Sequence, residues 1–383
     1  MPTIRVRLPA KSRTYDIRIG TGVLGDLGPA VRESCGQTAR TVAVISNKIV
    51  FDLYGKPAID SLRRDGFTVK HFLAGDGERQ KSFRSLERVI AFLAENGLQR
   101  NDVVVALGGG VVGDLAGFAA AVYLRGVPLV QVPTTLLAQI DSSVGGKTGV
   151  NLASGKNLVG AFHQPAMVLI DTETLRTLPP RELTSGFCEM VKQGAVGSRQ
   201  LFDQTLGLLR LGTHSSGVLH AGGMRTDLAA TIAGHCRFKA SIVTRDERED
   251  VSRTDRGSRR ILNFGHTTAH AIEKVTNYRR FRHGEAVGYG ILVAGELSNS
   301  LGMLPSRELE LLRDAVALCG ALPRADDLGL TQIIDAMTAD KKVVEGKLKW
   351  VLLERIGKPR IVDSAEIKGT VLRSALAAGL RSK

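Results

Sequence analysis

Three of the chain's eight histidines lie within eighteen residues of one another. His266 and His270 stand four apart in "LNFGHTTAHAIE", and His283 follows in "RHGEAVGYG". Because residues four apart on a helix share one face, we expect His266 and His270 to point into the same cavity. Imidazole nitrogen is a preferred zinc ligand, and a catalytic zinc keeps one coordination position open. The spacing therefore predicts a catalytic metal site rather than three separately packed histidines.

A carboxylate that could complete this site lies in a second predicted helix. The stretch "GFCEMVKQG" offers Glu189 and Lys192, three residues apart. The two histidines at positions 266 and 270 lack the intervening glutamate of the metalloprotease helix motif, so a catalytic base has to come from elsewhere. Two histidines and one carboxylate would suit ferrous iron as well as zinc. The spacing alone leaves that choice open.

A glycine-rich turn earlier in the chain has the features of a pyrophosphate site. "GGGVVGD" (108–114) follows the apolar run "VVVAL" and opens a predicted helix. Glycines let the backbone approach a phosphate, and a helix N-terminus directs N–H groups at the anion. The usual dinucleotide fingerprint also has an acid about 20 residues later, but residues 119–140 contain none. The acidic candidate is instead upstream, in "DGERQK" (76–81).

The stretch "SSVGGKT" (142–148) is similar to the end of a P-loop, but Asp141 occupies the position of its first glycine. That departure argues against ATP hydrolysis. We expect the whole segment "TTLLAQIDSSVGGKTGVNLASGKN" to be a binding loop that carries Asp141, Lys147, Lys156 and Asn157.

The elements that must position these groups alternate between strand and helix in the first half of the chain. "TIRVRLP" and "YDIRIG" predict an early hairpin, and strands are expected at "TVAVISN", "TVKHFLAG", "DVVVALGGG" and "VPLVQVP" with helices between them. Such alternation is typical of a parallel sheet covered by helices. After Pro179 and Pro180 the pattern is nearly all helical. We therefore predict an α/β nucleotide-binding domain over residues 1–179 and a mostly α-helical metal- and substrate-binding domain over residues 180–383.

Composition limits the remaining function classes. The chain has 383 residues and 43% apolar content, with no signal peptide and no apolar run long enough for a bilayer, so we expect no membrane association. Its four scattered cysteines favour reduced thiols in the cytoplasm. We interpret the net charge of +14 mainly as a basic protein surface. Without interleaved aromatic residues it does not favour nucleic-acid binding, but part of it could attract an anionic substrate.

Nine motifs of the chain resemble the 3-dehydroquinate synthase family, in that family's order, from about residue 40 to 360. They are "GGGVVGDLAGF", "RGVPLVQVPTTLLAQIDSSVGGKTGVN", "GKNLVGAFHQP", "LPPREL", "CEMVKQG", "LNFGHTTAHAIE", "HGEAVGYG", "DKK" and "WVLLERIG". The resemblance implies an N-terminal α/β nucleotide-binding domain, a C-terminal helical domain, and a homodimer with the active site between the domains.

The resemblance also assigns roles to residues. It implies one catalytic zinc, with cobalt as an alternative, on Glu189, His266 and His283, and places His270 outside the ligand set. This differs from the expectation that both helix histidines bind metal. The implied substrate-side residues are Arg259 and Lys239 at a carboxylate, Lys147, Asn157, Asn263, His270 and Lys341 or Lys342 at a phosphate, Asp141 and Lys192 at hydroxyls, and Arg125 reaching the neighbouring subunit's site. The implied NAD-side residues are Asp76, Gly77, Glu78, Arg79, Gln80, Lys81, Gly110, Val111, Val112, Gly113, Asp114, Thr134, Thr135, Lys147, Lys156, Thr174, Leu175, Arg176 and Thr177.

The implied reaction converts 3-deoxy-D-arabino-heptulosonate 7-phosphate to 3-dehydroquinate and phosphate, a step toward the aromatic amino acids. In the family, NAD takes a hydride from the substrate, phosphate is eliminated, the hydride returns, and an aldol closure forms the ring. NAD is regenerated in each turnover. A metal acting as a Lewis acid would ease the hydride loss.

Two departures from the family pattern stand out. Asn47 replaces a common acid after the first parallel strand, which predicts altered cofactor affinity. Residues 246–263 are about six residues longer than usual before Arg259, and we expect a solvent-facing bulge there, with Arg260 as the alternative inward residue.

Three rival functions remain open. A sister sugar phosphate cyclase of the valiolone or inosose type would have no use for Arg259 beside Lys239. A metal- and NAD-dependent polyol dehydrogenase would release NADH. A basic nucleic-acid binder would show salt-dependent retention on DNA without binding NAD.

Overall fold

The computed structural model describes the whole chain except residues 1–13, 153, 213–221, 251, 342–348 and 382–383. The first half forms one six-stranded sheet, in which every strand pairs in parallel and the order is β1-β8-β5-β4-β2-β3. Its strands are β1 (Asp16–Gly20), β2 (Thr41–Asn47), β3 (Thr68–Ala74), β4 (Val103–Gly108), β5 (Leu129–Pro133) and β8 (Met167–Asp171).

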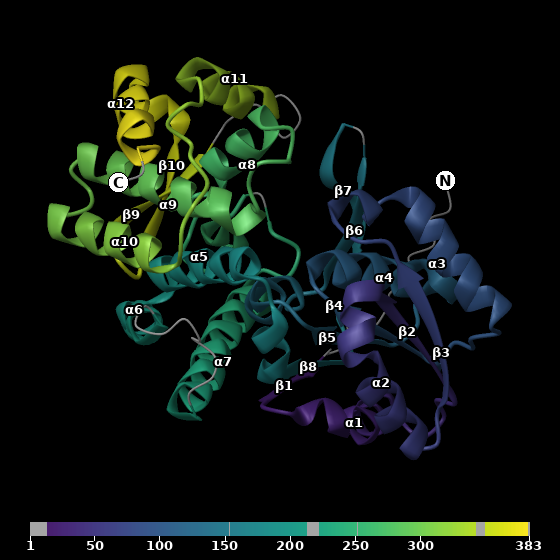
Figure 1. The fold of residues 1–383 in the computed structure, drawn as a ribbon. Helices are drawn as coiled ribbons and strands as arrows, with labels where there is room; N and C mark the ends of the chain where they lie inside the picture. Colours follow the sequence, from purple (N-terminus) through teal and green to yellow (C-terminus); the bar gives the residue numbers. More distant parts are fainter. Residues whose placement is uncertain (1–13, 153, 213–221, 251, 342–348, 382–383) are drawn as a thin grey trace, which may run out of the picture.

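Helices cover both faces of this sheet (Figure 1). They are α1 (Leu27–Cys35), α2 (Lys48–Arg64), α3 (Phe83–Glu95) and α4 (Gly110–Val122). One apolar cluster joins α1 and α2 to the sheet, and a second joins α3 and α4 to its other face. The central strand β4 is buried along its whole length, as its uninterrupted apolar sequence predicts. The expected doubly covered α/β half is confirmed.

The second half is mostly helical and packs around the long buried helix α9. Its helices are α5 (Pro180–Gly197), α6 (Arg199–Gly212), α7 (Gly222–Arg245), α8 (His266–Val275), α9 (His283–Ser300), α10 (Ser306–Leu318), α11 (Leu330–Lys341) and α12 (Gly369–Gly379). A two-stranded antiparallel sheet, β9 (Lys349–Arg355) with β10 (Lys358–Asp363), lies among them. Among the described residues, none of the helices combines the length and apolar character that crossing a membrane would require.

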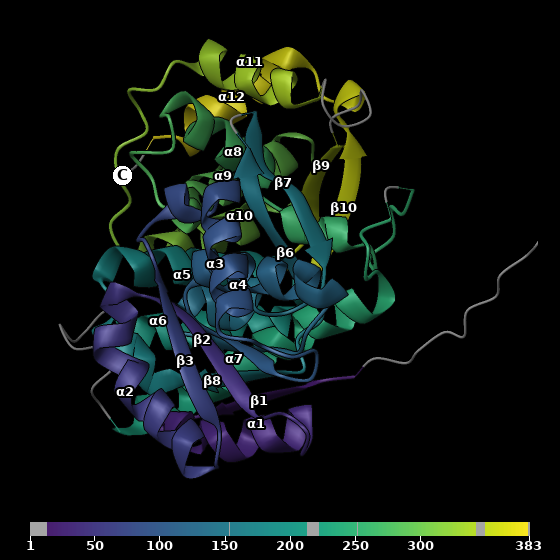
Figure 2. The ribbon, with the colours of Figure 1, turned by 90° about the vertical axis from the view of Figure 1, so that its right-hand side faces the viewer.

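Two expectations about local structure need correction. The second strand of the predicted early hairpin is β1, and it pairs in parallel with β8; the first strand lies outside the described residues. The expected binding loop contains a π-helical turn over Ala138–Ser142 and an antiparallel hairpin of β6 (Lys147–Leu152) and β7 (Gly155–Phe162). Figure 2 shows this hairpin extending from the sheet half toward α8 and α9. The glycines indicate a loop, but the hairpin also contains the β-branched residues Thr148, Val150 and Val159, which favour strands.

The close packing of α9 against the start of α8 requires glycine at one position. A Cβ on Gly290 would lie 2.0 Å from the carbonyl oxygen of Gly265. Overpacking a core typically costs about 1–3 kcal/mol, and here the obstacle is backbone. We expect Gly290→Ala to lower the free energy of unfolding by about 2 kcal/mol or more, measured by urea denaturation. The control is Gly207→Ala on the exposed face of α6, where a Cβ meets nothing within 4 Å. Equal midpoints for the two variants would contradict this account.

Candidate active site

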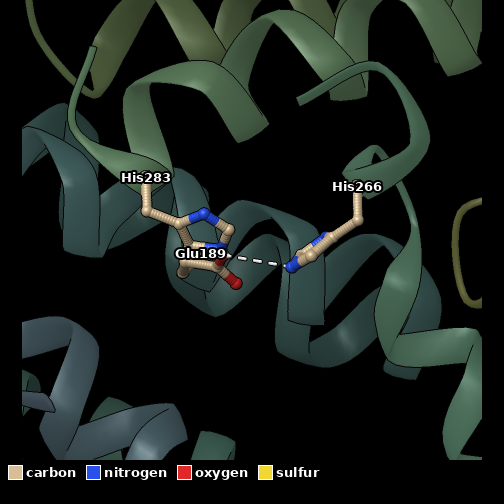
Figure 3. A group of neighbouring side chains, drawn as sticks. All are labelled: Glu189, His266 and His283. Carbon is tan, nitrogen blue, oxygen red and sulfur yellow. Dashed lines mark ion pairs between the residues drawn. The ribbon is translucent and has the colours of Figure 1, made fainter. Parts of the chain in front are cut away.

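Glu189, His266 and His283 meet at one point although three separate elements carry them (Figure 3). Glu189 lies within α5, and the two histidines are the first residues of α8 and α9. Nε2 of His266 lies 3.8 Å from Oε1 of Glu189, and Nε2 of His283 lies 3.5 Å from the same oxygen. Two ligand atoms on a tetrahedral zinc at about 2.1 Å lie about 3.4 Å apart. The donor types and their spacing therefore fit one zinc-sized ion.

A second group of possible metal ligands, His270, Glu273 and His283, shares one histidine with the first. Both oxygens of Glu273 are already engaged, because Oε1 lies 3.0 Å from Nζ of Lys156 and Oε2 lies 3.4 Å from Nδ1 of His283. His270 is exposed, and its ring centroid lies 5.5 Å from that of His266. The geometry favours the first group and leaves His270 beside it.

The surroundings of Glu189 and His266 suit both residues for binding a metal. Oε2 of Glu189 lies 2.7 Å from Nζ of Lys192, an ion pair whose angles fall short of a hydrogen bond, and Oε1 stays directed at both histidines. Nδ1 of His266 lies 3.2 Å from the carbonyl oxygen of Phe264, which orients the ring. Burial, and then the positive charge of Lys192, lower the pKa of His266 well below its ordinary value. A neutral imidazole of this kind can donate its lone pair to a metal.

Asp141 joins two lysines next to this group. Its Oδ2 lies 3.3 Å from Nζ of Lys192, and its Oδ1 contacts Nζ of Lys239 on α7. Both lysines are buried. Burial, together with the nearby charge of Arg259, lowers the pKa of Lys239 well below its ordinary value. The structure thus brings Asp141, Lys192 and Lys239 together, and Lys192 connects them to Glu189.

Arg259 faces inward, whereas Arg260 is half-buried. Arg259 is 3% exposed. Its Nη1 donates to the carbonyl oxygens of Gly145 (3.2 Å) and Glu247 (2.8 Å), and its Nη2 donates to that of Gly145 (3.3 Å). These bonds use three of the five guanidinium N–H donors, which leaves two for a ligand. The preceding segment is mostly exposed between its buried ends, Asp246 and Gly257–Ser258, in the residues that the structure describes. An Arg253–Asp255 ion pair lies there.

The predicted phosphate residues do not all lie together. Nζ of Lys147 contacts Oε2 of Glu249, and Nδ2 of Asn263 lies 3.4 Å from Oε1 of the same carboxylate. Asn157 contacts Lys81 instead. Lys341 is the last residue of α11, and Lys342 lies outside the described residues.

The sheet half presents a helix N-terminus at the predicted nucleotide site. Helix α4 begins at Gly110, after Gly109, which has no side chain to cap it. A Cβ on Gly110 would lie 3.1 Å from Oγ of Ser142, so a larger residue would crowd the turn. The hydroxyl of Thr134 is buried and has no hydrogen-bond partner among the described residues. Strand order reverses between β2 and β4, the position where open α/β sheets bind ligands. These features fit a dinucleotide pyrophosphate.

Among the other predicted cofactor-side residues, Lys81 contacts the helix that follows this turn. Lys81 is buried and contacts both Asp114 of α4 and Asn157 of β7. Burial raises the pKa of Asp114, although the charge of Lys81 opposes the shift. Residues 174–177 lie in the short helix Thr172–Thr177. Asn47 caps α2, because its Oδ1 accepts from the backbone N–H of Val50 (2.9 Å). Its amide nitrogen is therefore the group that could donate to a ligand.

Sequence reasoning missed two acidic residues of the site. Glu249 lies between Lys147 and Asn263, and Glu273 lies between Lys156 and His283. Glu273 carried a usable signal: it is three residues after His270 and thus shares its helix face. Glu249 carried none, because it belongs to an acidic run typical of a solvated surface.

Comparison with known proteins identifies the family of the chain. Residues 71–185 match the family model of the 3-dehydroquinate synthase N-terminal region, and residues 186–343 match that of its C-terminal region. The chain is 45% identical over 367 residues to a 3-dehydroquinate synthase of Pelotomaculum thermopropionicum, covering 94% of this chain and 92% of that one.

Two solved cyclases share the fold. One is ValA, a 2-epi-5-epi-valiolone synthase of Streptomyces hygroscopicus with NAD⁺ and Zn²⁺ bound (TM-score 0.83, 27% identity, 98% and 99% of the two chains). The other is a 2-deoxy-scyllo-inosose synthase complexed with carbaglucose-6-phosphate, NAD⁺ and Co²⁺ (TM-score 0.78, 26% identity, 95% and 96%). Because both family models match and the identity is high over nearly the whole length, the chain belongs to the 3-dehydroquinate synthase family.

Proposed function

We propose that this protein is a 3-dehydroquinate synthase, which converts 3-deoxy-D-arabino-heptulosonate 7-phosphate to 3-dehydroquinate and phosphate. Full-length similarity to 3-dehydroquinate synthases supports the activity. The observation that carries the chemistry is the meeting of Glu189, His266 and His283 beside the Asp141–Lys192–Lys239 group. Incubating the purified protein with this substrate, catalytic NAD and zinc, and following both products, tests the proposal.

The proposed cofactors are NAD and one divalent metal, with zinc preferred and cobalt as the alternative. Glu189, His266 and His283 would hold the metal, which supplies Lewis acidity to a substrate oxygen. The turn before α4, with Thr134, would hold NAD, which supplies reversible hydride acceptance. The bound ligands of the two related cyclases support both choices.

The chain's own residues would bind and orient an anionic substrate. Arg259 offers two uncommitted N–H donors close to the charge of Lys239, an arrangement suited to a carboxylate. Lys147 and Asn263 would bind the phosphate after the phosphate displaces the carboxylate of Glu249. The carboxylate of Asp141 keeps Lys192 and Lys239 in place and could exchange hydrogen bonds with substrate hydroxyls.

Retention of Arg259 at this position argues against the sister cyclases. A sugar phosphate without a carboxylate has no second anionic group to pair with Arg259, and an unpaired buried charge is costly. The lower identity to those cyclases, 26–27% against 45%, points the same way. No observation here favours a polyol dehydrogenase or a nucleic-acid binder.

We also propose a homodimer in which Arg125 reaches the partner's site. Arg125 and Leu124 both have positive φ, 66° and 48°, and the apolar side chains of Val122 and Leu124 are exposed. A strained segment with exposed apolar groups is typical of a surface that a partner covers. Cytoplasmic location stays a prediction, as does the domain division after residue 179.

NAD should act as a recycled cofactor. We expect one equivalent of NAD per site to support many turnovers, because the proposed reaction regenerates its cofactor. The absorbance of NADH at about 340 nm should therefore not increase. Product formation that stops at one per NAD, with stoichiometric NADH, would instead identify a polyol dehydrogenase.

A further inference from the structure

Glu273 is a buried carboxylate that connects the two halves of the chain. It lies on α8 and is 3% exposed. Its Oε1 lies 3.0 Å from Nζ of Lys156 on the β6–β7 hairpin, and its Oε2 lies 3.4 Å from Nδ1 of His283. Nζ of Lys156 also lies 4.4 Å from the ring centroid of Tyr278, so this lysine is held from two sides at the end of α8.

The contact with His283 fixes which ring nitrogen can bind metal. With Nδ1 donating its proton to Glu273, Nε2 keeps its lone pair and faces Oε1 of Glu189 at 3.5 Å. A carboxylate behind a metal-bound histidine sets the tautomer, fixes the ring plane and raises ligand basicity. The other two ligands already have such partners, Lys192 for Glu189 and the carbonyl of Phe264 for His266.

We propose that Glu273 is a positioning residue that orients His283 for the metal and at the same time anchors the β6–β7 hairpin through Lys156. The inference rests on the metal and NAD sites of the proposed function. Metal affinity depends on Glu273 through His283, and cofactor affinity depends on it through Lys156. One side chain therefore links the metal site of the helical half to the nucleotide site of the sheet half.

Metal affinity tests the first arm without any need for turnover. We expect Glu273→Gln to weaken Zn²⁺ binding 10- to 100-fold, measured by chelator competition in the absence of NAD, because loss of an outer partner has effects of this size. The visible spectrum of the Co²⁺-loaded variant should also change, since the His283 ring is no longer fixed. The matched control is Glu296→Gln, another buried carboxylate in an ion pair, with Arg313 on α10. It should bind Zn²⁺ as the wild type does.

A double-mutant cycle on NAD affinity tests the second arm. Glu273→Gln should raise the Kd for NAD in the wild-type background but not in Lys156→Met, where the anchored group is already gone. Lys156→Met should leave Zn²⁺ affinity within about three-fold, because its link to the metal runs only through Glu273. Wild-type Zn²⁺ affinity in Glu273→Gln would overturn the inference. A wild-type protein that binds no Zn²⁺ would overturn the proposed metal site itself.

Discussion

His283→Ala should lose its metal and, with it, activity. The variant removes one of three protein ligands, and loss of even an outer partner typically weakens metal binding 10- to 100-fold. We therefore expect Zn²⁺ affinity to fall by more than about 100-fold, and turnover at limiting zinc to fall at least as far. Metal analysis after dialysis measures the first effect. Full zinc occupancy in His283→Ala would show that the ion is not bound there.

Two further histidine variants decide which group binds the ion. The preferred ligand set contains His266, and the alternative set contains His270. His266→Ala should lose zinc, whereas His270→Ala should keep it and lose rate, as expected for a residue that contacts substrate. The opposite pattern would transfer the site to His270, Glu273 and His283. It would also require Glu273 to leave Lys156, its partner at 3.0 Å.

Apolar runs and the alternation of strand and helix patterns made much of the fold predictable from the sequence. The run "VVVAL" is apolar on both faces, as a central parallel strand must be, and β4 is buried throughout. Pro180 is the first residue of α5, which is the position where proline is tolerated best in a helix. The hairpin β6–β7 was not predictable in the same way, because the segment that contains it carries five glycines, Gly145, Gly146, Gly149, Gly155 and Gly160, and glycine is depleted in strands. Pairing between its two strands also depends on contacts that no local pattern encodes.

Residue types and spacing pointed to this part of the chain, but the spacing alone indicated His266 and His270, and neither group of possible metal ligands among the described residues contains both. His266 and His270 share a helix face, yet the ligand geometry favours His283, which starts the next helix. Only tertiary packing of α8 against α9 brings these two residues together. Acidic partners such as Glu249 are harder to predict still, since ion pairs depend on side-chain positions and not on sequence separation.

Arg259 should decide substrate choice. A guanidinium matches a carboxylate through two parallel hydrogen bonds, and lysine offers only a point charge. Losing a buried charge partner typically costs about 2–5 kcal/mol. We therefore expect Arg259→Ala to lower kcat/KM by roughly 30-fold or more with zinc and NAD saturating, and Arg259→Lys not to restore it. Because Arg259 also donates to the carbonyls of Gly145 and Glu247, the Kd for NAD and the unfolding midpoint must be measured alongside.

Arg260→Ala is the matched control for this effect. Arg260 follows directly in the chain and carries the same charge, but it is half-buried while Arg259 is 3% exposed. Its loss should change kcat/KM by less than about three-fold, because surface charges away from a bound ligand act weakly. If Arg260→Ala is the impaired variant, the six-residue insertion has shifted the register by one position. If both variants turn over the heptulosonate phosphate normally, the pocket does not bind a carboxylate there. Activity on a sugar phosphate without a carboxylate would then make a sister cyclase the better assignment.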